Sequence, residues 1–138
     1  QVWNRKYKAI QKYIVLTGGE PMLQTNSSLV QSLKQKGFFV ALETNGTIDI
    51  NINFDWICVS PKNLNLWKVK KGDELKIIYP QSKFNLNYLK KLNFKYFFLQ
   101  PLDDSKKKQV NIMKTIDYCR SHKPWFPSFQ IHKTLNVN

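Results

Sequence analysis

The sequence is poor in cysteine, and it lacks long apolar runs. Its 138 residues contain two cysteines, Cys58 and Cys119, which lie far apart in the chain. Two such cysteines are no disulfide framework, so we expect a reducing, cytoplasmic setting. No apolar run approaches the ~18 residues of a membrane-spanning helix, and no charged-then-apolar leader opens the chain. We therefore expect neither a membrane span nor a secretory signal.

Acidic residues and arginine are also scarce. The 22 Lys+Arg outnumber the 9 Asp+Glu and give a formal net charge of +13, but Arg5 and Arg120 are the only arginines. Bidentate recognition of phosphates and bases favours arginine over lysine. Since the lysines are also scattered, we interpret the charge as solvated surface and compositional drift. A basic RNA-binding module remains the non-enzyme alternative, and it predicts RNA binding with a steep salt dependence.

Apolar residues make up 42% of the chain and aromatic residues 14%, enough for a sizeable core. No linker or repeat divides residues 1–138, which we expect to form one domain. Six apolar runs have the length of strands. The first five are nearly continuous, as expected for strands buried on both faces, and Pro127 suits an edge strand. The runs are Tyr13–Leu16, Phe38–Leu42, Trp56–Val59, Leu75–Tyr79, Tyr96–Leu99 and Trp125–Ile131.

Helical patterns lie between several of these runs. Asn26 can cap a helix that Gly37 ends, a second helix is predicted from about Asn85 to Leu92, and a third begins near Ser105. The third helix carries its apolar side chains at positions 110, 112, 113, 116 and 119. Alternating strands and helices predict a parallel sheet. The chain is too short for an eight-stranded barrel, so we expect an incomplete α/β barrel of about six strands or an open α/β sheet.

Polar clusters follow the carboxyl ends of five predicted strands. Those ends share one rim in a parallel α/β structure, and ligands bind there. The sequence therefore predicts a composite small-molecule site. The clusters are Thr17-Gly18-Gly19-Glu20-Pro21, Glu43-Thr44-Asn45-Gly46-Thr47, Ser60-Pro61-Lys62, Gln100-Pro101-Leu102-Asp103 and Gln130-Ile131-His132-Lys133.

Each cluster also has a purely structural explanation. Gly18 and Gly19 form either a tight turn or an opening through which a ligand reaches the backbone. Glu20 either accepts from an ammonium group or leads a helix. Cys119 and His122 have the i, i+3 spacing of a ligand pair, but no further ligands accompany them, so we predict no complete metal site in this chain.

The ordered motifs resemble a known family. Thr17–Pro21 (T-G-G-E-P) resembles the S-adenosylmethionine-binding signature of radical S-adenosylmethionine enzymes. Five further motifs make the set similar to the 7-carboxy-7-deazaguanine synthase family, over the chain from about Tyr13 to its end. They are E-T-N-G-T (Glu43–Thr47), S-P-K (Ser60–Lys62), E-L-K (Glu74–Lys76) and L-Q-P (Leu99–Pro101), followed by W-x-x-S-x-Q-x-H-K (Trp125–Lys133).

The resemblance implies a carbon–nitrogen lyase of queuosine and deazapurine biosynthesis. A 4Fe-4S cluster would cleave S-adenosylmethionine to a 5′-deoxyadenosyl radical, which starts the conversion of 6-carboxy-5,6,7,8-tetrahydropterin to 7-carboxy-7-deazaguanine. The family implies Mg²⁺, an electron donor such as flavodoxin or ferredoxin, and a homodimer. An activating enzyme of the same superfamily is the alternative.

The resemblance also implies roles for individual residues, although it names no catalytic side chain. Thr17, Gln130 and His132 would contact the substrate. S-adenosylmethionine would be bound by Gly18, Gly19, Glu20, Glu43, Asn45, Ser60, Pro61, Lys62, Gln100, Pro101, Leu102 and Asp103.

One departure from the family limits these expectations. The family's three cluster cysteines precede the G-G-E-P strand, whereas residues 1–12 contain no cysteine and the chain begins at Gln1 instead of Met. We therefore expect the carboxy-terminal part of a synthase, without the amino-terminal strand and cluster loop. Such a chain should not cleave S-adenosylmethionine by itself, because a cluster needs thiolate ligands.

Overall fold

The computed structural model describes residues 11–130. These residues form a sheet of six strands in chain order, with every neighbouring pair parallel. This sheet confirms the predicted α/β class, and its order leaves β1 and β6 at opposite edges. The strands are β1 (Lys12–Leu16), β2 (Phe38–Thr44), β3 (Trp56–Val59), β4 (Lys71–Tyr79), β5 (Asn93–Pro101) and β6 (Trp125–Pro127).

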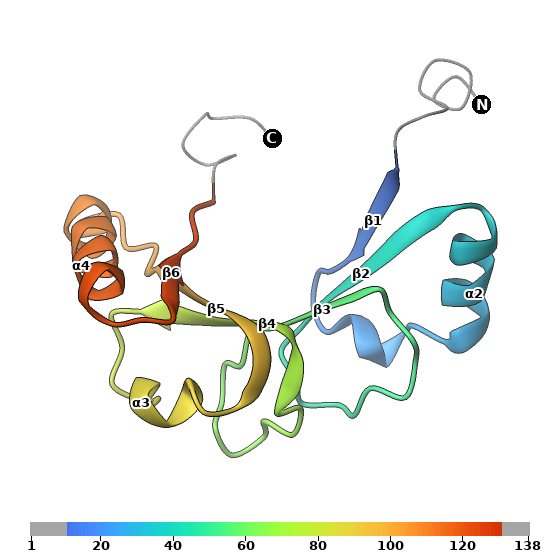
Figure 1. Ribbon diagram of the computed structural model, residues 1–138, viewed down its shortest axis with the longest axis horizontal. Helices are drawn as coiled ribbons and strands as arrows, with labels where there is room; N and C mark the ends of the chain where they lie inside the picture. The colour runs from blue at the N-terminus through green and yellow to red at the C-terminus, as the bar shows by residue number, and fades with distance from the viewer. Residues whose placement is uncertain (1–10, 131–138) are drawn as a thin grey trace.

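The sheet is curved, and its helices cover the convex side (Figure 1). A 3₁₀ helix, η1 (Pro21–Leu23), and the helix α2 (Ser27–Gln35) connect β1 with β2. The short α3 (Leu86–Leu89) precedes β5, and α4 (Lys108–Ser121) connects β5 with β6. Within residues 11–130 the strand ends therefore lie along an open arc, so the described part of the chain forms a partial barrel (Figure 1).

Local signals set the ends of α2 as the sequence predicted. The Asn26 side chain accepts a 2.9 Å hydrogen bond from the Leu29 N–H, which would otherwise lack a partner in the first turn. Gly37 follows the helix with φ +79°, a left-handed conformation that glycine adopts without steric cost. The helix packs Val30 against Val40 and Leu42 of β2.

The core lies between the convex face of the sheet and the helices. Val40, Leu42, Leu75, Ile77 and Leu99 are fully buried and alternate along β2, β4 and β5 with residues of the concave face. Such alternation places every second side chain on the same face of a strand. Burying a Leu or Ile side chain stabilises a fold by roughly 1.5–3 kcal/mol, so this row of side chains fixes the register of the strands.

The concave face corrects the prediction of strands buried on both sides. Tyr13 is 67% exposed and Val15 50%, and Tyr96 is also exposed. Aromatic side chains nevertheless pair across this face: the rings of Tyr96 and Trp56 stack with centroids 5.8 Å apart. Side chains of each continuous apolar run thus alternate between the convex face, which the helices cover, and the concave face, which is open and carries aromatic rings.

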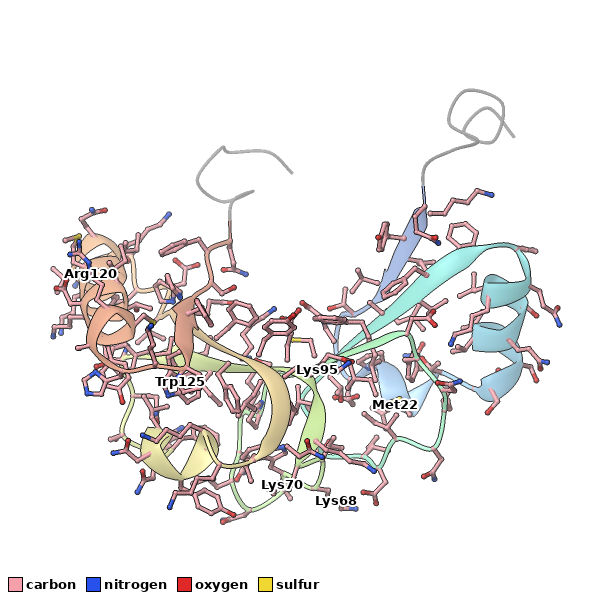
Figure 2. The ribbon with its side chains drawn as sticks, viewed as in Figure 1. Met22, Lys68, Lys70, Lys95, Arg120 and Trp125 are labelled. Carbon is pink, nitrogen blue, oxygen red and sulfur yellow. The ribbon has the colours of Figure 1, made fainter. Side chains whose placement is uncertain are left out.

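The region around α4 and β6 corrects two further predictions. The sixth strand ends at Pro127, whereas the sequence predicted an end at Ile131. Pro127 has no N–H to donate to β5. The last hydrogen bond to β5 within residues 11–130 is from the Ser128 N–H to the Leu99 carbonyl, at 2.9 Å, and the chain leaves the sheet after it. The third helix begins at Lys108 and buries its Asn111, Thr115 and Cys119 face. That face lies against β5 and β6, beside the buried Trp125 (Figure 2).

Val110 and Met113, two of the apolar side chains that this helix carries, are exposed. The polar side chains on the buried face are satisfied: Asn111 Nδ2 donates to the Leu102 carbonyl at 3.0 Å, and Thr115 Oγ1 donates to the Asn111 carbonyl at 2.7 Å. The apolar positions of this helix therefore do not by themselves mark its buried face, which combines Cys119 with two polar residues. The second helix is likewise shorter than predicted, although Asn85 caps it. Within residues 11–130, no helix is long and apolar enough to cross a membrane.

Candidate functional site

A cleft of about 220 Å³ lies at the carboxyl ends of the strands. Its lining comes from the segments that follow β1, β2 and β3, together with side chains near the ends of β4 and β5 and one beyond β6. We call it the rim cleft. Its residues are Thr17, Gly18, Gly19, Glu43, Thr44, Asn45, Ser60, Lys62, Lys76, Gln100 and Gln130.

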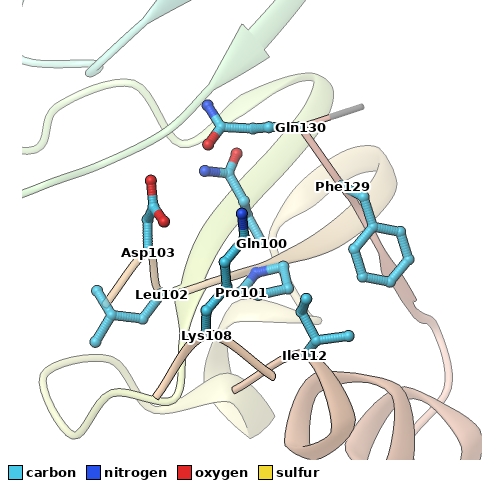
Figure 3. Close-up of a pocket in the computed structure, with 8 residues that line it drawn as sticks. All are labelled: Gln100, Pro101, Leu102, Asp103, Lys108, Ile112, Phe129 and Gln130. Carbon is cyan, nitrogen blue, oxygen red and sulfur yellow. The ribbon is translucent and has the colours of Figure 1, made fainter. Parts of the chain in front are cut away.

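A small hollow of about 40 Å³ adjoins the rim cleft and shares Gln100 and Gln130 with it. We call it the side hollow. Figure 3 shows it between the segment after β5 and the first turns of α4. Its remaining lining is Pro101, Leu102, Asp103, Lys108, Ile112 and Phe129. The two spaces together form a polar cleft with a mostly apolar extension at one end.

The turn after β1 leaves its backbone open. Gly18 has φ +93°, and no other heavy atom lies within 4 Å of where a Cβ would stand at either Gly18 or Gly19. The positive φ requires glycine at position 18, but packing does not require it at position 19. The space beside both residues allows a ligand to approach backbone N–H and C=O groups directly.

Glu20 is engaged by the protein itself. Its Oε1 accepts hydrogen bonds from Thr44 Oγ1 at 2.7 Å and from the Met22 N–H at 3.1 Å, and its Oε2 accepts from the Asn45 N–H at 2.8 Å. Glu20 also caps η1 and does not line the rim cleft. Its role toward an ammonium group stays a prediction, whereas its role in joining the turns after β1 and β2 is visible.

Glu43 and Lys76 form an ion pair in the rim cleft. Lys76 Nζ lies 2.9 Å from Glu43 Oε1, and Thr17 Oγ1 donates to Glu43 Oε2 across 3.4 Å. Burial lowers the pKa of Lys76, but the acidic groups of Cys58, Glu43 and Glu74 outweigh it and raise that pKa above its ordinary value. Lys76 is therefore a partly buried cation at neutral pH, balanced by Glu43.

The turn after β3 places a second cation in the cleft. Lys62 is exposed, and its Nζ lies 3.3 Å from Ser60 Oγ. Lys62 forms no ion pair with the described residues, so its ammonium is available to an anionic group. Pro61, which the sequence placed in the site, is buried and does not line the cleft.

The structure brings most of the predicted site residues together. Gln130 is in place although it lies beyond the end of β6, and His132 falls outside the described residues. Thr44, which the sequence placed in a rim cluster without a role of its own, also lines the cleft. The sequence assigned no site role to four further lining residues: Lys76, Lys108, Ile112 and Phe129. A usable signal existed for Lys76, because it stands between the apolar Leu75 and Ile77 near the end of a strand. Lys108 and Ile112 belong to the helix, and no local pattern marked them.

The described residues do not fit an iron–sulfur cluster or a divalent metal. No group of three or more His, Cys, Asp or Glu side chains is placed to hold a metal within residues 11–130. Cys58 on β3 and Cys119 on α4 are both buried and unpaired. Burial raises the pKa of the Cys58 thiol to about 12 and that of Cys119 to about 11. Neutral, buried and separated thiols are unsuited to a cluster, which is held by thiolates.

The chain is similar to curated proteins named 7-carboxy-7-deazaguanine synthase. It is 44% identical over 126 residues to the one from Burkholderia multivorans and 43% identical over 126 residues to the one from Bradyrhizobium diazoefficiens. Each alignment covers 91% of this chain and 60% of the relative, so the chain spans less than two thirds of these relatives' length. No protein-family model matches the chain.

A third relative and a solved structure complete the comparison. The synthase of Bacteroides thetaiotaomicron is 33% identical over 132 residues, which cover 96% of this chain and 68% of that protein. The crystal structure of QueE from Escherichia coli superposes with a TM-score of 0.69 at 23% identity, over 94% of this chain and 60% of that one, and so shares the fold. The chain belongs to the 7-carboxy-7-deazaguanine synthase family.

Proposed function

We propose that this chain forms the S-adenosylmethionine-binding rim of a 7-carboxy-7-deazaguanine synthase. The proposed reaction converts 6-carboxy-5,6,7,8-tetrahydropterin to 7-carboxy-7-deazaguanine with loss of ammonia, which makes the whole enzyme a carbon–nitrogen lyase. One observation carries the proposal: motifs from five separate segments converge on the rim cleft and the side hollow. Turn chemistry alone gives no reason for glycines, a free lysine and paired polar side chains to meet there.

The chemistry of the lining fits the parts of S-adenosylmethionine. The exposed Lys62 ammonium suits its carboxylate, since charge-assisted hydrogen bonds are the stronger kind. The open backbone at Gly18 and Gly19 suits its amino-acid end, and Glu43 with Asn45 suits the ribose. The small side hollow, with Pro101 and nearby Phe129 (Figure 3), offers apolar contacts to one edge of a flat base. When bound, S-adenosylmethionine supplies the radical chemistry, and the protein supplies orientation.

The 4Fe-4S cluster and Mg²⁺ have no fitting ligands among the described residues, so we assign no step of the reaction to either group here. We propose that the cluster is not assembled on this chain's own cysteines and that the isolated chain is inactive. An electron donor such as flavodoxin or ferredoxin, and a homodimeric state, remain proposals for the whole enzyme.

Isothermal titration of the chain with S-adenosylmethionine tests the binding proposal. We expect saturable binding, and we expect Lys62→Ala to weaken it about 10- to 100-fold, the usual range for a lost hydrogen bond to a charged group. Lys90→Ala is the matched control, because Lys90 is exposed beside α3, away from the rim cleft. Absence of binding, or equal binding by Lys62→Ala and the unaltered chain, would contradict the proposal.

A reconstitution experiment tests the proposed inactivity of the isolated chain. The chain is incubated with iron, sulfide, dithionite and S-adenosylmethionine under anaerobic conditions, and 5′-deoxyadenosine is measured by chromatography. We expect none above the protein-free control. Formation of 5′-deoxyadenosine that is lost in a Cys58→Ala, Cys119→Ala variant would show that these thiols do hold a cluster.

A further inference from the structure

Lys76 spans two strands to reach its partner. It lies on the concave face of β4, and Glu43 lies on β2, with β3 between them. The 2.9 Å contact between Lys76 Nζ and Glu43 Oε1 therefore crosses the middle of the sheet. Both residues line the rim cleft.

The two side chains differ in their access to solvent. The Lys76 side chain is 17% exposed, whereas that of Glu43 is 44% exposed. The other acidic side chain near Lys76, Glu74, already accepts a 2.7 Å hydrogen bond from Trp56 Nε1. Glu43 is thus the carboxylate that holds the Lys76 ammonium, and its exposed side chain lines the rim cleft.

The second carboxylate oxygen of Glu43 is weakly occupied. Glu43 Oε2 accepts one long hydrogen bond of 3.4 Å, from Thr17 Oγ1. A carboxylate oxygen has capacity for more than one donor. Because Lys76 already balances the charge of Glu43, the pair as a whole attracts a further cation only weakly. The donor that suits Oε2 is therefore an uncharged one, such as a hydroxyl group.

We propose that Lys76 is a positioning residue that holds the Glu43 carboxylate so that its second oxygen, Oε2, accepts from the hydroxyl groups of a sugar. This inference deepens the proposed function and rests on it, since the sugar is the ribose of S-adenosylmethionine. Lys76 itself does not touch the ligand. Loss of Lys76 would leave the Glu43 side chain free to rotate and its negative charge without a partner. The cleft would then lose its preference for hydroxylated sugars.

The test compares two ligands on the same chain. Dissociation constants are measured by titration for S-adenosylmethionine and for its 2′,3′-dideoxyribose analogue. We expect the unaltered chain to prefer the hydroxylated ligand about 10- to 100-fold, as for hydrogen bonds to a charged group. In Lys76→Met this preference should fall below about threefold, and Lys76→Arg should retain most of it by restoring the charge.

Two further variants separate positioning from a general structural effect. Glu43→Gln should lose the same preference as Lys76→Met, and the double variant should lose no more, because the two residues act as one unit. Lys71→Met, on the same strand but outside the rim cleft, should keep the full preference. Circular dichroism checks that each variant is folded. Should Lys76→Met fail to fold, Lys76→Gln, which keeps a hydrogen-bond donor without the charge, takes its place with the same expected loss of preference.

The outcomes distinguish this inference from the proposed function. Binding of S-adenosylmethionine without any preference over the analogue would overturn the inference alone. A full preference in the folded Lys76→Met or Lys76→Gln variant would also overturn it alone. If the unaltered chain bound neither ligand, the proposed function would fall and the inference with it.

Discussion

The hydroxyl of Thr44 donates a 2.7 Å hydrogen bond to Oε1 of Glu20. Thr44 is 3% exposed at the end of β2, and its oxygen also accepts from the Gly46 N–H at 3.0 Å. The pair thus joins the turn after β1 to the turn after β2, two segments that both contribute to the rim cleft. The Glu20 carboxylate, which the T-G-G-E-P motif suggested as a ligand-binding group, therefore holds together two turns that form the cleft.

Replacing Thr44 by valine should destabilise the chain by about 1–3 kcal/mol, because the change leaves the Gly46 N–H without its partner and removes one of the two hydrogen bonds to Glu20 Oε1. The free energy of unfolding is measured by urea denaturation. Thr47→Val is the matched control, since the described structure gives the Thr47 hydroxyl no hydrogen bond, and it should stay within about 0.5 kcal/mol. Equal effects of the two substitutions would contradict the role of Thr44.

Replacing Gly46 by alanine should cost more than replacing a glycine in an open turn. Gly46 has φ +74°, and a Cβ there would lie 2.9 Å from Trp67 Cδ1 and 2.9 Å from Val59 Cγ1. We expect a loss of about 2–4 kcal/mol, from strain and overpacking together. Gly37→Ala, where φ is +79° and no heavy atom lies within 4 Å of the added Cβ, should cost only about 1 kcal/mol. Thermal and urea unfolding of both variants test this difference.

Stability should decrease in acid partly through Asp55. Burial raises the pKa of Asp55, but hydrogen bonds from Lys34 and the Val40 N–H, with the charge of Lys34, outweigh it, and the net pKa is lowered. Since the native pKa lies below the unfolded one, the stabilisation is present above the unfolded value of about 3.9 and is lost as the pH falls through the native value. The pair is partly exposed, so the effect is at most about 1 kcal/mol.

Asp55→Asn isolates this contribution. Its free energy of unfolding should lie below that of the unaltered chain at pH 7, and the gap should close as the pH approaches 2. Asp117→Asn, whose side chain forms no ion pair among the described residues, serves as the control and should show no such gap. A gap for Asp55→Asn that persists unchanged in acid would contradict the assignment.

The edge strand β1 should promote self-association. Within residues 11–130, β1 pairs only with β2, and it carries the exposed Tyr13 and Val15 on the concave face. An unpaired strand edge with exposed apolar side chains is a site for intermolecular pairing. Val15→Lys should lower the associated fraction in sedimentation velocity at a given concentration. Leu23→Lys, which also replaces an exposed apolar side chain but lies in η1, should change it little.

Much of the fold was predictable because local patterns encode it. The strand Trp56–Val59 was predicted with its observed bounds, and Asn26 and Gly37 bound α2 as expected. These signals depend on side chains that act within a few residues of themselves. The buried face of α4 could not be found in this way, because its polar residues are satisfied by the Leu102 carbonyl and by the helix's own backbone.

The candidate site divides in the same way. The sequence by itself determined which segments reach the rim, since carboxyl ends of parallel strands meet at one edge of a sheet. Only the tertiary structure decided what each side chain does there. It engaged Glu20 with Thr44 and brought Lys76 across β3 to Glu43. Both contacts join strands far apart in the sequence, and their geometry depends on the curvature and register of the sheet, which no local pattern specifies.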